Sequence, residues 1–86
     1  MKEGILRPCA YGRIQLHLKE LMDQRGINRN QMAKWIGTRF EVVNKWYEGS
    51  VEKLDLDILA RLCYVLECQA GDLIEYQEPA PEDYKN

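Results

Sequence analysis

The sequence has a single histidine and only three cysteines, and these residues do not form a metal-ligand pattern. His17 is distant in sequence from Cys63 and Cys68, and the cysteines are odd in number without a paired spacing. A zinc site is therefore not expected, and Cys63 is interpreted as a reduced thiol in an apolar helical stripe. Catalysis would require a nucleophile beside a base, which one histidine and scattered carboxylates do not supply. We expect no metal, no cofactor, no small-molecule substrate and no enzymatic activity.

Long apolar segments are also missing. No apolar run approaches the roughly 20 residues that a membrane span needs, and the N-terminus lacks the apolar centre of a signal peptide. We expect a cytoplasmic protein with no membrane partner. With 86 residues, 45% of them hydrophobic, the chain fits one small domain whose core is only just large enough to stand alone. A homodimer would help to stabilise it.

The sequence lacks an excess of positive charge, because its 12 lysines and arginines are outnumbered by 14 aspartates and glutamates, for a formal net charge of -2. A nucleic-acid-binding surface requires lysine and arginine to neutralise phosphates, so the total argues against one. The charges are unevenly distributed, however. Residues 54–86 hold two basic and eight acidic groups, whereas residues 1–27 and 28–53 each hold five basic and three acidic groups. A modestly basic surface therefore remains on residues 28–53.

Residues 28–49 have the pattern of two short helices joined by a tight glycine turn. Each helix shows a start signal, an apolar face and a glycine stop. In the first helix these are Asn28, then Met32, Ala33 and Ile36, then Gly37. In the second they are Thr38 or Arg39, then Val43 and Trp46, then Gly49. This layout is typical of a helix-turn-helix.

Periodicity predicts three further helices around this pair, which gives an all-α bundle of five helices. They are residues 16–25 with Leu18, Leu21 and Met22 inward, residues 55–66, and a short closing turn within residues 69–74 plugged by Leu73 or Ile74. For residues 55–66, Asp55 is the expected N-cap, and the buried stripe is Leu56, Leu59, Leu62, Cys63 and Leu66, widened by Ile58 and Val65.

Residues 12–15 and 75–77 fit a short two-stranded ribbon that joins the ends. We expect an extended arm at residues 1–11, the domain at 12–77 and an acidic disordered tail at 78–86.

Residues 13–76 resemble the Cro and lambda-repressor family of helix-turn-helix regulators, often called Xre-like. The matching stretches occur in order and with gap-free spacing. They are residues 18–22, 27–29, 32–33, 36–37, Val43, Trp46, Gly49 and 59–63. Residues 56–59 and 71–76 look most like the small single-domain members. The resemblance implies a compact, five-helix, lambda-repressor-like DNA-binding domain.

In that family the third helix lies in the major groove and its early exposed residues meet base edges. The resemblance assigns this role to Phe40, Glu41, Asn44 and Lys45. Glu41 could accept a hydrogen bond from cytosine N4, Phe40 could touch a thymine methyl, and Lys45 could donate to guanine O6 or N7. In the alternative interpretation, Phe40 packs locally and Glu41 pairs with Lys45 four residues later.

The resemblance also assigns phosphate contacts, which precede and follow the presumed reading helix. The residues are Asn28, Arg29, Asn30, Arg39 and Lys53. The N-terminal amides of the helix that begins near Asn28 would add a partial positive charge. Glu41 and Glu48 depart from a basic surface and are expected to weaken affinity. Met22 and Tyr47 stand where some relatives hold a buried ion pair, and are expected to fill that space with apolar volume.

These features predict a sequence-specific, double-stranded-DNA-binding transcriptional regulator that acts as a homodimer. The dimer surface is expected at the end formed by the last two helices and at the N-terminal arm, with its apolar Ile5, Leu6 and Cys9. The alternative is a protein-interaction module, such as an antitoxin or a corepressor subunit, that meets a basic partner.

Trp35 is expected to be partly exposed, either as a partner contact or covering lysine and arginine stems on its own surface. Trp46 is expected in the core.

Overall fold

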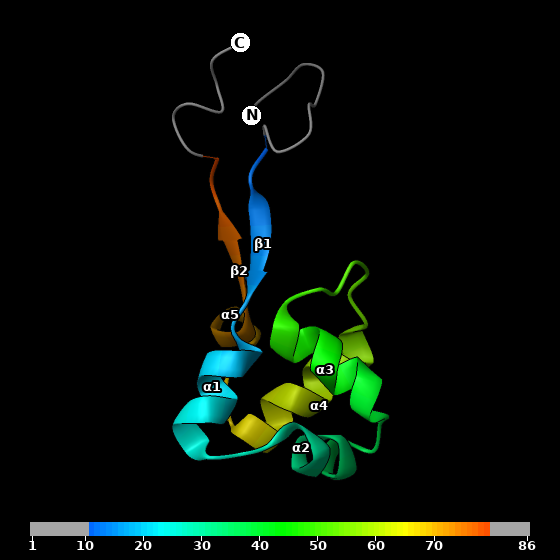
Figure 1. Ribbon diagram of the computed structural model, residues 1–86. Coiled ribbons are helices and arrows are strands. Elements are labelled where there is room, and N and C mark those ends of the chain that lie inside the picture. Colours follow the sequence, from blue (N-terminus) through cyan, green and yellow to red (C-terminus); the bar gives the residue numbers. More distant parts are fainter. Residues whose placement is uncertain (1–10, 80–86) are drawn as a thin grey trace.

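A computed structural model describes residues 11–79, whose helices form a small bundle with a two-stranded ribbon extending from it (Figure 1). The described elements are β1 (Arg13–Leu16), α1 (Leu18–Arg25), α2 (Arg29–Ile36), α3 (Phe40–Glu48), α4 (Leu56–Leu66), α5 (Ala70–Leu73) and β2 (Ile74–Gln77). The prediction of five helices with a short ribbon is confirmed. Of the predicted arm at residues 1–11 and the predicted tail at 78–86, only residues 11, 78 and 79 are described. Ile5, Leu6 and Cys9, which were predicted to contribute to a dimer surface, lie outside the described residues.

Side-chain caps fix the starts of α2 and α4. The Oδ1 atom of Asn28 accepts a hydrogen bond from the amide of Gln31 at 2.7 Å, and that of Asp55 accepts from the amides of Asp57 and Ile58 at 2.9 and 3.2 Å. Each cap satisfies backbone N–H groups that have no partner inside the helix. Both N-caps were predicted, and both are confirmed.

The turn between α2 and α3 depends on Gly37. This residue has φ +69°, a left-handed conformation that costs a non-glycine residue roughly 1–2 kcal/mol. The amide of Thr38 donates to the Ala33 carbonyl at 3.0 Å, and that of Gly37 donates to the Lys34 carbonyl at 3.3 Å. These bonds close the end of α2. Arg39 is then the N-cap residue of α3, in extended conformation.

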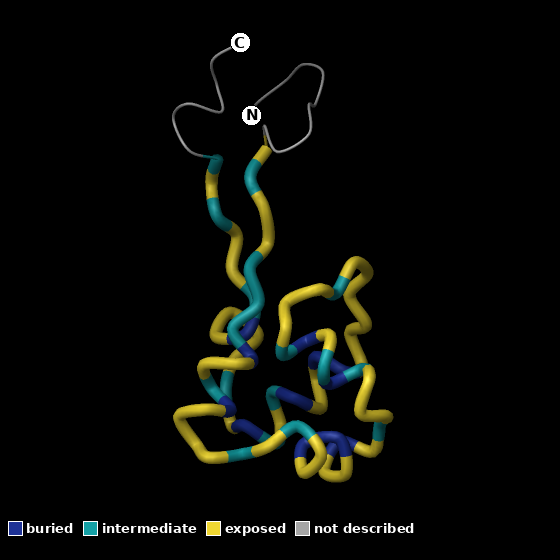
Figure 2. Tube along the Cα trace, viewed as in Figure 1, coloured by how far each residue is buried: buried dark blue, intermediate teal, exposed yellow. Residues whose placement is uncertain are grey.

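The core lies between the inner faces of the helices, where Figure 2 shows the buried parts of the trace. Its buried side chains are Leu18, Met22, Met32, Ala33, Ile36, Val43, Trp46, Ile58, Leu59, Leu62, Leu66 and Leu73. Burial of each large aliphatic side chain contributes roughly 1.5–3 kcal/mol. Trp46 is a core residue as predicted. Of the two predicted plugs for the closing turn, Leu73 is fully buried and Ile74 is partly buried.

The ribbon pairs the two ends of the described chain. β1 and β2 are antiparallel, with Arg13 opposite Gln77 and Leu16 opposite Ile74. Because side chains alternate along a strand, the apolar residues of both strands share one face, and Leu16 and Ile74 pack against the core from there. The apolar Ile14, farther from the bundle on the same strand as Leu16, is exposed.

His17 connects the base of the ribbon to α1. Its amide donates to the Leu73 carbonyl at 2.8 Å. Its ring nitrogens Nδ1 and Nε2 lie 2.9 and 2.7 Å from carboxylate oxygens of Glu20 and Glu75. The hydrogen bond to Glu75, and then that to Glu20, raise the pKa of His17 above its ordinary value of 6.5. Both ring nitrogens can donate at once only in the protonated form.

Three details of the predicted elements are wrong. Leu16 is not helical but pairs in β1, so the first helix begins at Leu18 and the strand lies one residue later than predicted. Leu56 was predicted to be buried but is 71% exposed. It lies in the first turn of α4, beyond the part of this helix that packs against the rest of the core. Cys63 is partly buried and packs at the margin of the core.

Candidate nucleic-acid interface

The core fixes how α3 is rotated and therefore which of its side chains face solvent. Val43 and Trp46 are buried, so the opposite side of the helix is turned outward. Glu41 and Lys45 are exposed there. Among the ion pairs of residues 11–79, none joins these two side chains, so both are available to a ligand.

Phe40 and Asn44 are placed differently, because both face Arg29 at the start of α2. The guanidinium carbon of Arg29 lies 5.5 Å from the centre of the Phe40 ring, and Nη1 donates to Asn44 Oδ1 at 2.6 Å. Phe40 is 38% exposed and Asn44 is partly buried. The structure thus brings Arg29 together with two predicted base-contacting residues. Phe40 packs locally against Arg29 with part of its ring, as the alternative interpretation predicted, and the rest of the ring is exposed.

The other predicted phosphate-contacting residues lie at the start of α2, at the N-cap of α3 and in the loop after α3. Asn28 has its side-chain oxygen engaged as the cap of α2. Asn30 is exposed in the first turn of α2, Arg39 is exposed at the N-cap of α3, and Lys53 is exposed in the loop after α3. Because α2 begins beside α3, its N-terminal amides lie close to the same surface.

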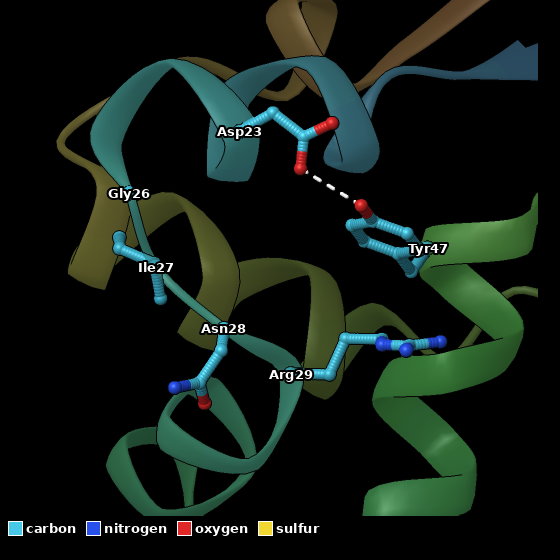
Figure 3. A pocket seen from close by; sticks show the side chains of 6 residues that line it. All are labelled: Asp23, Gly26, Ile27, Asn28, Arg29 and Tyr47. Carbon is cyan, nitrogen blue, oxygen red and sulfur yellow. Dashed lines mark hydrogen bonds between the residues drawn. The ribbon is translucent and has the colours of Figure 1, made fainter.

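A surface hollow of about 420 Å³ lies at the start of α2 (Figure 3). On its wall, the Tyr47 hydroxyl donates to Asp23 Oδ1 at 2.8 Å. The other carboxylate oxygen of Asp23, Oδ2, lies 2.9 Å from Nζ of Lys19, which is outside the hollow. Hydrogen bonds from Lys19 first, and then from Tyr47, lower the pKa of Asp23. Its carboxylate is therefore charged and paired, so the hollow holds no isolated negative charge.

Tyr47 also forms the second ring against Arg29, with its centre 4.9 Å from the guanidinium carbon. Figure 3 shows Arg29 reaching from α2 toward α3, next to this ring. The expectation that Tyr47 simply fills apolar space is therefore incomplete, whereas Met22 is fully buried as expected. Tyr47 joins α3 to both α1 and α2.

Arg61 supports the other end of α2, and sequence reasoning missed it. Its Nη1 donates to the Ile36 carbonyl at 2.8 Å, while Nη2 pairs with Asp57 at 2.7 Å. The spacing of Asp57 and Arg61, four residues apart on a helix, signals the ion pair. No local pattern signals the contact with α2. Arg61 thus connects α4 directly to the turn that precedes α3.

Trp35 is 51% exposed, as predicted. It lies beside a shallow apolar hollow of about 400 Å³ between α2 and α4. The residues around this hollow are Trp35, Ile36, Ala60, Arg61, Tyr64 and Val65.

Two short helices joined by a glycine turn, with the second presenting polar side chains outward, define a helix-turn-helix protein. The sequence model of the Cro/C1-type helix-turn-helix (HTH) DNA-binding domain matches residues 17–79. The chain belongs to this family, which is a family of DNA-binding domains and not of enzymes.

A similar solved structure is that of a proposed DNA-binding protein from Bacteroides fragilis. The TM-score is 0.65 at 16% sequence identity, and the match covers 73% of this chain and 100% of that chain. At this level of identity the likeness establishes the fold. Among curated proteins, none matches this chain. No helix within residues 11–79 has both the length and the apolar character required to traverse a lipid bilayer.

Proposed function

We propose that this protein is a transcriptional regulator that binds double-stranded DNA sequence-specifically, with α3 in the major groove. The observation that carries the proposal is the fixed rotation of α3. Val43 and Trp46 are buried, so Glu41 and Lys45 project from a helix that cannot turn about its axis. The major groove is about 12 Å wide and admits such a helix. Lys45 would donate to guanine, and Glu41 would accept from cytosine N4.

Phosphate contacts would come from both sides of α3. Arg29 and Asn30 lie at the start of α2, Arg39 precedes α3, and Lys53 follows it. Arg29 uses one donor on Asn44, and a guanidinium has four more. Asn28 would contribute its amide nitrogen, because its oxygen caps α2. Glu41 and Glu48 are exposed on the same helix and would lower affinity unless they meet a base donor.

We further propose that two copies bind one operator. A single module contacts too few base pairs for useful affinity, and two-fold dimers place two reading helices one DNA turn apart, about 34–36 Å. Sedimentation of the protein with a selected duplex should give two chains for each duplex. A complex with one chain at saturation would contradict the dimer and leave the DNA-binding role intact.

The first test is retention on random duplex DNA at different salt concentrations. We expect binding at about 50 mM salt that is lost by about 200 mM, because binding to phosphates releases counterions. The measurement is the fraction of duplex bound in a titration at each salt concentration. Absence of binding at 50 mM would contradict the proposed function and favour a protein partner instead.

The second test separates base contacts from phosphate contacts. Lys45→Ala should change which sequences are recovered from a random duplex pool, whereas Lys53→Ala should weaken binding to every sequence by a similar factor. Lys53→Ala is a matched control because it also removes one exposed lysine. If both variants recover the wild-type sequence, Lys45 does not read a base.

A further inference from the structure

Three residues of α3 form a single stripe that faces Arg29. Phe40, Asn44 and Tyr47 are spaced four and three residues apart, so they lie on one side of the helix. The guanidinium of Arg29 lies against both rings, 5.5 and 4.9 Å from their centres, and donates to the Asn44 oxygen between them at 2.6 Å. Arg29 is itself partly buried. Two ring contacts and a charge-assisted hydrogen bond therefore hold this side chain in one place.

This contact determines which way the carboxamide of Asn44 points. Arginine has five N–H donors and no acceptor, so the Asn44 atom that faces it must be the oxygen and not the nitrogen. The amide nitrogen then lies on the other side of the group. Both N–H donors of Asn44 are left for an incoming ligand, whereas one of the two lone pairs of its oxygen is already engaged by a charged donor.

The orientation matters because the bases present different patterns in the major groove. An asparagine that reads adenine uses both of its polar atoms, donating to N7 and accepting from N6. Guanine presents two adjacent acceptors, O6 and N7, and thymine presents one, O4. With both donors free, Asn44 therefore matches guanine best. The paired contact with adenine is disfavoured, because the N6 donor of adenine would have to share the Asn44 oxygen with the guanidinium of Arg29.

Given the DNA-binding mode proposed above, on which this inference rests, we propose that Asn44 reads a guanine and that Arg29 is the positioning residue that disfavours adenine there. The operator thus carries a guanine whose recognition depends on a contact between α2 and α3.

The test uses the full chain and a duplex recovered from a random pool. The base read by Asn44 is the position whose preference disappears in Asn44→Ala. At that position we expect wild-type protein to bind the guanine duplex about tenfold more tightly than the same duplex with adenine, which is the size of one good base contact.

Arg29→Met is the decisive variant, because its long apolar side chain retains contact with the two rings but cannot donate to Asn44. Loss of the cation should weaken binding to all duplexes, as the loss of any phosphate contact would. The preference at the Asn44 position should in addition shift from guanine toward adenine, because no guanidinium then competes with adenine N6 for the Asn44 oxygen. A purely structural role for Arg29 would weaken binding without this shift. The double variant Arg29→Met/Asn44→Ala should show no preference there.

The outcomes are distinguishable. Wild-type protein that binds duplex DNA but prefers adenine at this position, or shows no preference that depends on Asn44, overturns this inference and leaves the proposed function standing. Unchanged preference for guanine in a folded Arg29→Met protein overturns the role of Arg29. If the variant does not fold, as judged by circular dichroism, the wild-type preference measured against Asn44→Ala still decides the assignment of guanine. Absence of any duplex binding overturns the proposed function itself.

Discussion

One series of charged and aromatic side chains beside α3 holds three helices together. Lys19 pairs with Asp23, which accepts a hydrogen bond from Tyr47, and the Tyr47 ring packs on Arg29. This series of contacts joins α1, α3 and α2 on the surface. Exposed ion pairs contribute only about 0–1 kcal/mol each, so their main effect is to restrict where Tyr47 and Arg29 can lie.

His17 gives the stability of the protein a defined pH dependence. Its pKa is raised in the folded state by hydrogen bonds to Glu75 and Glu20. The resulting stabilisation is fully present below the unfolded-state pKa and is lost as pH rises through the folded-state pKa. We expect the melting temperature of wild-type protein, relative to His17→Gln, to be highest near pH 6 and to decline by pH 8.5.

Thermal unfolding followed by circular dichroism at both pH values measures this difference. His17→Gln is a suitable reference, because it keeps a polar side chain and removes the only histidine of the chain. A difference in melting temperature that does not change with pH would show that the imidazolium does not stabilise the fold.

Local sequence signals predicted some of these residues and could not predict others. Asn28 and Asp55 cap helices through contacts within three residues of themselves, so their role is visible in the sequence. Arg29 and Asn44 are fifteen residues apart, and their contact exists only once α2 and α3 have packed. Family resemblance placed both residues in a nucleic-acid interface, but it gave no information about the bond between them.

At the scale of elements, Arg61 shows how α4 stabilises the turn before α3. Arg61→Ala removes the donor to the Ile36 carbonyl and the ion pair with Asp57. We expect a loss of about 1 kcal/mol in the free energy of unfolding, the usual size for a partly exposed hydrogen bond. Urea unfolding measures the change.

Lys34→Ala is the control for this prediction, because Lys34 is an exposed basic residue in the last turn of α2. Its substitution should alter stability by less than about 0.5 kcal/mol. Equal stability of the two variants would indicate that Arg61 does not support the turn.

Whole elements were more predictable than their ends. The apolar spacing in α2, α3 and α4 identified the helices, because most of each apolar stripe is buried. The C-terminus of α4 carried no glycine signal, since Glu67 occupies its left-handed cap with φ 52°. Leu16 and Leu56 were misplaced because β pairing and helix coverage depend on segments distant in the sequence.

At the scale of the molecule, Gly12 controls how closely the two ends of the described segment approach each other. It has φ +84°, and a Cβ atom there would clash with the Gln77 carbonyl oxygen across the ribbon. Gly12→Ala should therefore lower the free energy of unfolding by about 1–2 kcal/mol or more. Gly71→Ala is the control, because Gly71 lies in α5 with open space around it. Urea unfolding of both variants measures the effect, and equal stability would contradict it.

The ribbon also has a consequence for the order of folding. Arg13 and Gln77, which face each other across it, are 64 positions apart. Closing so long a loop is entropically unfavourable until the intervening chain has become compact. We therefore expect the strands to pair after the transition state, and substitutions within them to alter the unfolding rate far more than the folding rate.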